Sequence, residues 1–319
     1  MKMDVKNKKG FEFSFGWIFA IIVGAVIIFL AIYGVTNFIK QQRGTSDTFA
    51  GKEIGIILSP VETSLESGKT NMISFPAETR VYNDCKTTGN FGSQGIRVAM
   101  KSGVGKEWQE PGLPSIFYNK YIFSTSTVEG KKAMVLAKPF SMPYKVADII
   151  LLWSAEEDYC FVNPPKEIED EIEDLSIERI NVTSSKGNCK KNSKKVCFGS
   201  TGCDVDVDLI SQRVKKYGQI IYYADDKENA LLYGAIFSDP GIYECQVKRL
   251  MKRASELALL YRAKSESLSP RGCSSNLESD LITYSNQTSV FNSSIALNDI
   301  QYSADELGRR NNALSCKLF

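Results

Sequence analysis

The chain has 319 residues, of which 43% are hydrophobic and 24% charged, and its formal net charge is +2. These values are typical of a folded protein with one large domain or two smaller ones, and they lack the basic excess of a dedicated nucleic-acid binder. The sequence contains no histidine, which excludes Ser-His-Asp and Cys-His nucleophile systems and any histidine-ligated zinc, iron or copper site.

The N-terminal segment predicts a membrane anchor. Residues 1–10 form a basic tail, and the positive-inside tendency keeps such a tail in the cytoplasm. Its lysines are Lys2, Lys6, Lys8 and Lys9. Residues 11–39 follow as an apolar segment, whose uncharged part from Phe15 to Ile39 is about 37 Å long as a helix and therefore spans a bilayer. A cleaved secretory signal has a shorter apolar core and a small-x-small cleavage site, which "TNFIKQQR" lacks.

One face of the predicted membrane helix carries small residues. Gly16, Ala20 and Gly24 recur every four residues, a spacing that lets two membrane helices approach closely. We expect the segment to contact the lipid bilayer and this face to support a homo-oligomer. Because glycine and alanine are common in membrane helices, an ordinary lipid-facing composition is the alternative.

Beyond the membrane the sequence predicts an α+β ectodomain. Residues 40–68 are expected to form a juxtamembrane helical stalk, in which "SPVE" has the spacing of a capping box. Residues 69–225 are expected to be rich in strands, with a hairpin around Gly218. The β-like runs, separated by Gly, Pro and Asn, are "NMISF", "TRVY", "GIRVAM", "NKYIFST", "KAMVLAKPF", "VADIILLW" and "YCFV". The acidic stretch "PPKEIEDEIEDLS" (164–176) predicts a short helix with a solvated polar face.

Residues 226–319 are expected to be helical. Asp239 and Pro240 begin a helix that runs to about residue 266, and two further helices are expected around 275–290 and 296–315. The first of these helices carries one apolar stripe, made of Val247, Leu250, Met251, Ala254, Leu257, Ala258 and Tyr261. Lys248, Arg249, Lys252 and Arg253 lie beside the stripe. We expect them to form a solvated face, with lipid headgroups or an acidic partner as the alternative.

A second group of carboxylates raises the question of a cation site. "KNSKKVCFGSTGCDVDVDL" (191–209) is expected to be a loop or edge strand, and its Asp204, Asp206 and Asp208 would share one face of a strand. An EF-hand loop that starts at Asp204 would need glycine and glutamate where this chain has Leu209 and Lys215. The three aspartates therefore remain a weak Ca²⁺ candidate, and we expect no metal.

The cysteines indicate an oxidised, extracytoplasmic domain. All eight follow the apolar segment, none forms a C-x-x-C pair, and disulfides are expected rather than zinc. The disulfide candidates are Cys85, Cys160, Cys189, Cys197, Cys203, Cys245, Cys273 and Cys316. Eight cysteines allow about 105 pairings, among which short loops favour bridges within Cys189, Cys197 and Cys203. Three N-x-S/T glycosylation candidates, at Asn181, Asn286 and Asn292, lie on the same side of the membrane segment.

No motif in the sequence names a reaction. "SGVGKE" (102–107) lacks the first glycine and the Ser/Thr of a phosphate loop, and neither S-x-x-K nor G-x-S-x-G occurs. Catalysis by paired carboxylates, by a Ser-Lys pair or by bound Mg²⁺ stays open on composition alone. We expect no catalytic residues, no cofactor and no enzymatic activity.

The N-terminus resembles type IV pilin-like proteins. "KKGF" (8–11) before a hydrophobic helix is similar to their processing site, which would place a cut after Gly10 and make Phe11 the first mature residue. That family has glutamate at the fifth mature position, whereas this chain has Phe15 there and Glu12 at the second. The resemblance implies a filament subunit as one alternative function.

A broader resemblance covers most of the chain. "FEFSFGWIFAIIVGA", "SFPAETRVYNDC", "KPFSMPYKVADII", "YCFVNPP", "AIFSDPGIYECQVKRLMKR" and "GCSSNL" together resemble a family of single-pass membrane-anchored proteins of small-genome (DPANN-type) archaea. This resemblance implies an archaeal source and a membrane topology, but no activity and no functional residues.

We therefore expect a bitopic cell-envelope protein with a cytoplasmic N-terminus and an extracytoplasmic domain that binds or scaffolds an envelope partner. The alternatives are the pilin-like subunit processed after Gly10 and an envelope hydrolase that uses carboxylates such as Asp204, Asp206 and Asp208.

Overall fold

The computed structural model describes residues 16–38, 70–101, 108–175, 177 and 179–319, which belong to two units, Met1–Ser46 and Asp47–Phe319. In the first unit, Gly16–Phe38 is an apolar helix of 23 residues, and it is the one described helix long and apolar enough to cross a membrane. This helix confirms that the central part of the predicted membrane segment is helical. The expected basic tail, the stalk with its capping box and the processing site after Gly10 lie outside the described residues.

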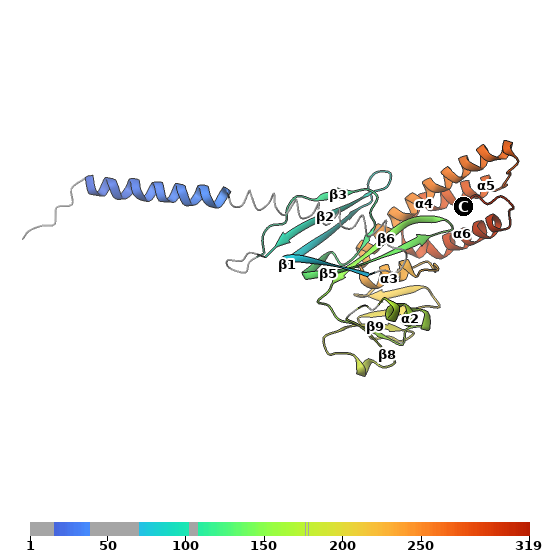
Figure 1. Cartoon of the computed structure of the whole chain (residues 1–319), viewed down its shortest axis with the longest axis horizontal. Helices are drawn as coiled ribbons and strands as arrows, with labels where there is room; N and C mark the ends of the chain where they lie inside the picture. The colour runs from blue at the N-terminus through green and yellow to red at the C-terminus, as the bar shows by residue number, and fades with distance from the viewer. Residues whose placement is uncertain (1–15, 39–69, 102–107, 176, 178) are drawn as a thin grey trace, which may run out of the picture. The chain divides into compact units, whose positions relative to one another are not determined.

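The second unit is a disulfide-bonded α+β domain, whose described strands form two sheets of six strands each (Figure 1). The first sheet has the order β3-β2-β1-β5-β6-β4 and is antiparallel except for the β4–β6 pair. Its strands are β1 (Thr70–Lys86), β2 (Ser93–Met100), β3 (Ser115–Phe117), β4 (Ile122–Phe123), β5 (Thr127–Ser141) and β6 (Lys145–Ser154). Each β-like run expected between residues 71 and 153 overlaps one of these strands.

The second sheet is mixed and has the order β12-β11-β10-β9-β7-β8. Its strands are β7 (Tyr159–Val162), β8 (Ile180–Thr183), β9 (Lys194–Phe198), β10 (Val205–Asp208), β11 (Arg213–Lys216) and β12 (Gln219–Tyr222). The hairpin expected around Gly218 is confirmed, because Tyr217 and Gly218 join β11 to β12 with φ values of 49° and 74°. Positive φ at both central residues is what a two-residue type I′ turn requires.

One expectation for the second sheet is wrong. β9 falls in the segment 191–209 that was expected to be a loop or edge, yet it lies inside the sheet between β7 and β10. Val196, Cys197 and Phe198 are buried, whereas Lys194 and Lys195 at the start of the strand are half-buried. The prediction was wrong because the lysines around this short apolar strand make the composition of the segment resemble that of a loop.

The helices follow the sequence pattern closely. They are α2 (Lys166–Asp174), α3 (Ala230–Phe237), α4 (Pro240–Leu268), α5 (Glu278–Ser289) and α6 (Leu297–Asn312), with short 3₁₀ turns η1 (Lys186–Asn188), η2 (Ser269–Arg271) and η3 (Ser294–Ala296). The acidic helix buries Ile168 and Ile172 and leaves most of its carboxylates outside, as expected. Pro240 occupies the first turn of α4, where a missing backbone N–H costs nothing.

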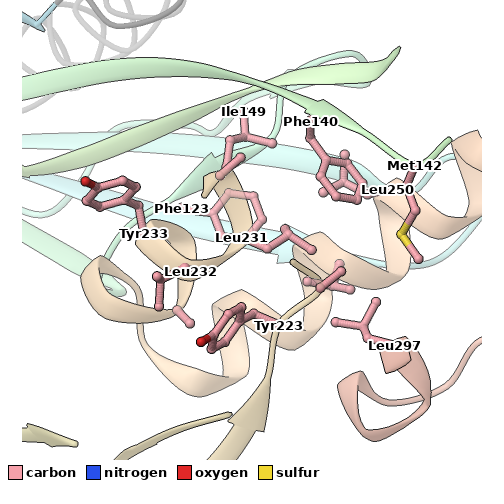
Figure 2. Close-up of a cluster of buried hydrophobic side chains, with 14 of the residues drawn as sticks. Phe123, Phe140, Met142, Ile149, Tyr223, Leu231, Leu232, Tyr233, Leu250 and Leu297 are labelled. Atoms are coloured by element: carbon pink, nitrogen blue, oxygen red, sulfur yellow. The ribbon is translucent and has the colours of Figure 1, made fainter. Parts of the chain in front are cut away.

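One hydrophobic core, the main core, joins both sheets to the helices (Figure 2). Its centre is α3, all of whose residues are buried and which contacts β4, β5 and β6 of the first sheet and β11 of the second. A helix that is apolar all round can be stable only when every face is covered. Gly234 lets α3 pack closely against Phe123 of β4, because a Cβ at this position would lie 2.8 Å from Cδ1 of Phe123. The strand-rich and helical parts therefore belong to one domain.

Four disulfides tie this domain together, and among the described residues no cysteine is free. The pairs are Cys85–Cys245, Cys160–Cys189, Cys197–Cys203 and Cys273–Cys316. All eight candidates are thus paired. The short-loop expectation is right for Cys197–Cys203. It is wrong for Cys189, which directly follows the η1 turn and pairs with Cys160 of β7.

Candidate functional site

The second sheet carries a groove on its outer face, the face opposite the main core. We call it the outer groove; its volume is about 610 Å³. Its walls come from the β9–β10 loop (199–201) and the β10–β11 turn, and β11 and β12 supply Arg213, Lys215 and Ile220. The cross-strand register places these side chains on one face of the sheet, since Lys215 of β11 lies between Asp206 of β10 and Ile220 of β12.

The rim of the outer groove exposes apolar side chains. Ile210 at the tip of the β10–β11 turn is 97% exposed, and Ile220 is 47% exposed. The turn is ordered by Asp208, whose Oδ1 accepts hydrogen bonds from the backbone N–H groups of Ile210 at 3.2 Å and Ser211 at 3.0 Å. The Ser211 bonds, with the nearby Arg213 guanidinium, lower the pKa of Asp208. A fixed turn that presents an exposed isoleucine suits contact with another macromolecule.

The three aspartates of the weak cation candidate each accept hydrogen bonds from a different segment of backbone. Asp204 accepts a hydrogen bond from the N–H of Lys195 at 2.8 Å, and Asp206 accepts bonds from Gly202 at 3.2 Å and Cys203 at 2.9 Å. Asp208 holds the β10–β11 turn described above. Within the described ranges no group of three or more His, Cys, Asp or Glu side chains could hold a metal ion. The arrangement stabilises turns and does not assemble a cation site.

A second hollow lies beside α6. This α6 cavity has a volume of about 600 Å³ and is bounded by the turn 141–143, the loop 224–228 and one face of α6. Gln301 of α6 fixes the loop, because its Oε1 accepts from the N–H of Asp225 and its Nε2 donates to the Asp225 carbonyl, both at 2.9 Å. Arg309 also lines the cavity, and it donates to Glu306 at 2.6 and 2.9 Å.

Asp226 gives the α6 cavity an unusual carboxyl group. Its Oδ1 accepts the backbone N–H groups of Glu228 and Ala230, each at 3.0 Å, so the side chain stabilises the first turn of α3. Burial nevertheless raises the pKa of Asp226 to about 6. On the opposite wall, burial and the charge of Asp225 raise the pKa of Asp305. The cavity therefore holds two carboxyl groups with a raised pKa, which the sequence alone did not indicate.

The domain also buries cations that the sequence analysis missed. Lys138 of β5 forms an ion pair with Glu171 of α2, and the hydroxyl of Tyr233 donates to the same carboxylate at 2.8 Å. Lys216 of β11 donates to the carbonyls of Ile236 and Ser238, which end α3, and burial lowers its pKa to about 8. Lys138 thus binds α2 to the first sheet, and Lys216 satisfies the carbonyl groups at the end of α3.

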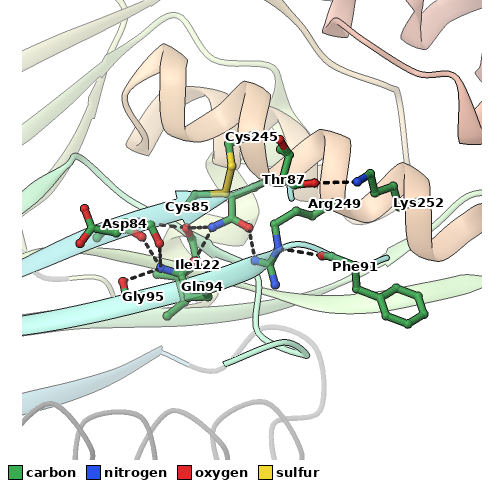
Figure 3. Close-up of a disulfide and its surroundings, with 12 residues drawn as sticks. Asp84, Cys85, Thr87, Phe91, Gln94, Gly95, Ile122, Cys245, Arg249 and Lys252 are labelled. Atoms are coloured by element: carbon green, nitrogen blue, oxygen red, sulfur yellow. Dashed lines mark hydrogen bonds between the residues drawn. A yellow bond between two sulfur atoms is a disulfide. The ribbon is translucent and has the colours of Figure 1, made fainter. Parts of the chain in front are cut away.

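Arg249 corrects the expectation of a solvated basic face on α4. Its side chain is fully buried, and it donates to the carbonyls of Phe91 at 3.1 Å, Tyr118 at 3.0 Å and Lys120 at 2.7 Å. Figure 3 shows the contact with Phe91. It also donates to Oε1 of Gln246 at 2.8 Å. The charge is satisfied by carbonyl oxygens, and burial lowers its pKa to about 10.

The surroundings of Arg249 form a polar network between α4 and the first sheet. Gln246 donates to Gln94 of β2 and, at 3.0 Å, to the carbonyl of Ile122; Lys252 donates to the carbonyls of Thr87 and Gly89 at 2.6 and 2.9 Å. The Cys85–Cys245 disulfide lies next to the network in Figure 3. Two of the four basic residues expected on the surface of α4 are thus used to close the β1–β2 loop. The periodicity of the sequence places Arg249 and Lys252 beside the apolar stripe, but it does not show that the β1–β2 loop packs against them.

The remaining candidate residues are exposed. Asn181 lies in β8, Asn286 in α5 and Asn292 just after α5, and all three side chains are exposed. In the N-terminal helix Gly16 and Ala20 are exposed and Gly24 is half-buried, and a Cβ at either glycine would meet nothing. Glycosylation and helix association both stay predictions.

Comparison of the chain with protein-family models, with curated proteins and with solved structures finds no match. The resemblances noted in the sequence accordingly remain predictions. The N-terminal hydrophobic helix and the disulfides indicate an extracytoplasmic domain, either secreted or membrane-anchored.

Proposed function

We propose that the chain is a bitopic cell-envelope protein: a retained N-terminal helix anchors it, the N-terminus is cytoplasmic, and the disulfide-bonded domain binds or scaffolds an envelope partner. The observation that carries this proposal is the combination of a 23-residue apolar helix with a domain that pairs its cysteines into four disulfides. Structural disulfides persist outside the reducing cytoplasm, so the helix and the disulfides support the same side of the membrane for the domain.

The surface of the domain supports binding rather than chemistry. The outer groove combines exposed apolar side chains with a turn ordered by Asp208, which favours contact with a protein partner. The aspartates proposed for a hydrolase each accept backbone hydrogen bonds from a different segment: Asp204 from Lys195 of β9, Asp206 from Cys203 and Asp208 from Ser211. These bonds occupy carboxylate oxygens that an acid–base pair would use. We therefore assign the domain a binding role and no reaction.

Topology is tested by labelling thiols on intact cells that express the full chain. A membrane-impermeant maleimide should leave the native protein unlabelled until a reductant is added. Thr283→Cys, at an exposed position of α5, should be labelled on intact cells, whereas the matched Asn7→Cys should be labelled only after lysis. Labelling of Asn7→Cys on intact cells, or eight reactive thiols without reductant, would contradict the topology.

Retention of the helix is tested separately by the mass of the protein extracted from membranes. The anchored form keeps residues 1–10, because no cut follows Gly10. A mature chain that begins at Phe11 would replace the permanent anchor by the pilin-like alternative.

A further inference from the structure

We propose that Asn181 is the N-glycosylation site of the folded domain and carries an oligosaccharide on the outer face of the second sheet. This inference rests on the proposed extracytoplasmic location. All three triplets satisfy the acceptor motif, and all three asparagines are exposed. The motif requires the hydroxyl group of the third residue, and the three triplets differ in how accessible this hydroxyl group is.

The hydroxyl groups of two sequons are closed off by the fold. Thr288, the third residue of the triplet that begins at Asn286, is fully buried within α5, and its Oγ1 donates to the carbonyl of Tyr284 at 2.8 Å. Ser294, the third residue of the triplet that begins at Asn292, is 1% exposed, accepts the N–H of Tyr222 at 2.9 Å and donates to Glu244. A transferase could engage either hydroxyl only after part of the domain unfolds.

The sequon at Asn181 is open in the folded domain. Asn181 is exposed in β8, and Thr183 is half-buried with hydroxyl contacts to Ser185 of 3.3 and 3.4 Å, which is near the outer limit of a hydrogen bond. The strand gives the triplet an extended backbone, whereas Asn286 lies in a helix. Ser184 and Ser185 follow on the surface and place no bulky side chain beside the acceptor nitrogen.

The location leaves room for an oligosaccharide. β8 is an edge strand of the second sheet, and its pairing with β7 places Asn181 beside Cys160. Asn181 therefore lies on the outer face, next to the Cys160–Cys189 disulfide and away from the core side, where Ile180 and Val182 pack. A sugar chain at this position would also shield a sheet edge from pairing with another chain.

The reaction transfers a sugar from a lipid-phosphate-linked oligosaccharide. A bond forms between Nδ2 of Asn181 and C1 of the first sugar, and the bond between C1 and the phosphate oxygen breaks. The lipid phosphate leaves with the electron pair of that bond, and one Nδ2 proton passes to a base of the transferase. The transfer involves no oxidation or reduction.

Trypsin separates the sequons into two peptides of the full chain. Cleavage after Arg179 and Lys186 releases "INVTSSK", which contains Asn181, and cleavage after Arg271 and Arg309 releases one peptide with both Asn286 and Asn292. After expression in a host that N-glycosylates exported proteins, mass spectrometry should show the first peptide shifted by the mass of a glycan and the second unmodified. Thr183→Ser should keep the shift, whereas Thr183→Ala and Asn181→Gln should abolish it.

Three results would overturn the inference. An unmodified "INVTSSK" from protein whose thiols are all oxidised would leave the topology intact and show that Asn181 is not an acceptor. Glycans on the second peptide at equal occupancy would show that the folded structure does not select the site. Reactive thiols in the same preparation would instead overturn the proposed topology, and this inference with it.

Discussion

The buried guanidinium of Arg249 gives the sharpest test of how the domain is held together. Arg249→Met keeps the approximate volume but removes every donor to three backbone carbonyls and to Gln246. Each buried acceptor left without a donor costs about 1–3 kcal/mol, while removal of the buried charge returns part of its desolvation cost. We expect a net loss of about 4 kcal/mol from the free energy of unfolding. Arg249→Lys, which keeps the charge but cannot reach all carbonyls, should lose about half of that.

The loss is measured by urea unfolding of the full chain in detergent, followed by near-UV circular dichroism. Arg262→Met is the matched control, because Arg262 lies on the same helix but forms only a surface pair with Glu266. Such pairs contribute about 0.2–1 kcal/mol, so the control should stay close to the native protein. If Arg249→Met were no less stable than Arg262→Met, the network would not close the β1–β2 loop as argued.

Three further changes probe other features of the domain. Burial raises the pKa of Asp226 from 3.8 to about 6, so the folded form holds a proton that the unfolded form releases. The free energy of unfolding of the native protein should therefore fall by about 2 kcal/mol relative to that of Asp226→Asn as pH rises from 4 to 7.5; an equal difference between the two proteins at both pH values would contradict this. Gly234→Ala should cost about 1–3 kcal/mol in thermal unfolding, because its Cβ would meet Phe123, whereas Gly241→Ala, whose Cβ meets nothing, should be nearly neutral. Joint replacement of Cys85 and Cys245 by serine frees a separation of 160 residues and should cost about 5 kcal/mol in urea unfolding; a loss below about 1 kcal/mol would refute the loop-closure argument.

The sequence predicts the elements of the fold well because their signals are local. The β-like run "KAMVLAKPF" predicts β5, the apolar stripe of α4 predicts the helix from Pro240, and Gly218 predicts its hairpin. The basic neighbours of the stripe carry no such signal. Arg249 is buried because the β1–β2 loop and residues 118–120, distant in sequence, fold over it.

The candidate surfaces depend on contacts that no local pattern encodes. The spacing of Asp204, Asp206 and Asp208 predicted a shared face. It could not show that backbone N–H groups of β9, of the loop before β10 and of the turn after β10 bind the three carboxylates. The outer groove needs β10, β11 and β12 in register, and the α6 cavity needs α6 beside the loop that follows β12. The pairing of Cys160 with Cys189 likewise follows from the place of β7 within the second sheet.

The Cys85–Cys245 bridge has a mechanical consequence for a domain tethered at its N-terminal side. If the N-terminal helix anchors the domain as proposed, force between that helix and α4 acts first on β1. The Cys85–Cys245 bond then transmits this force directly to α4. The residues between the two cysteines, which include most of both sheets, then carry none of that tension. Reduction of this one bond would let the same pull extend the chain by up to about 430 Å at about 3.4 Å per residue, because the Cys160–Cys189 and Cys197–Cys203 bridges within the loop stay closed. The disulfide thus acts as a covalent limit on how far the tethered domain can be stretched.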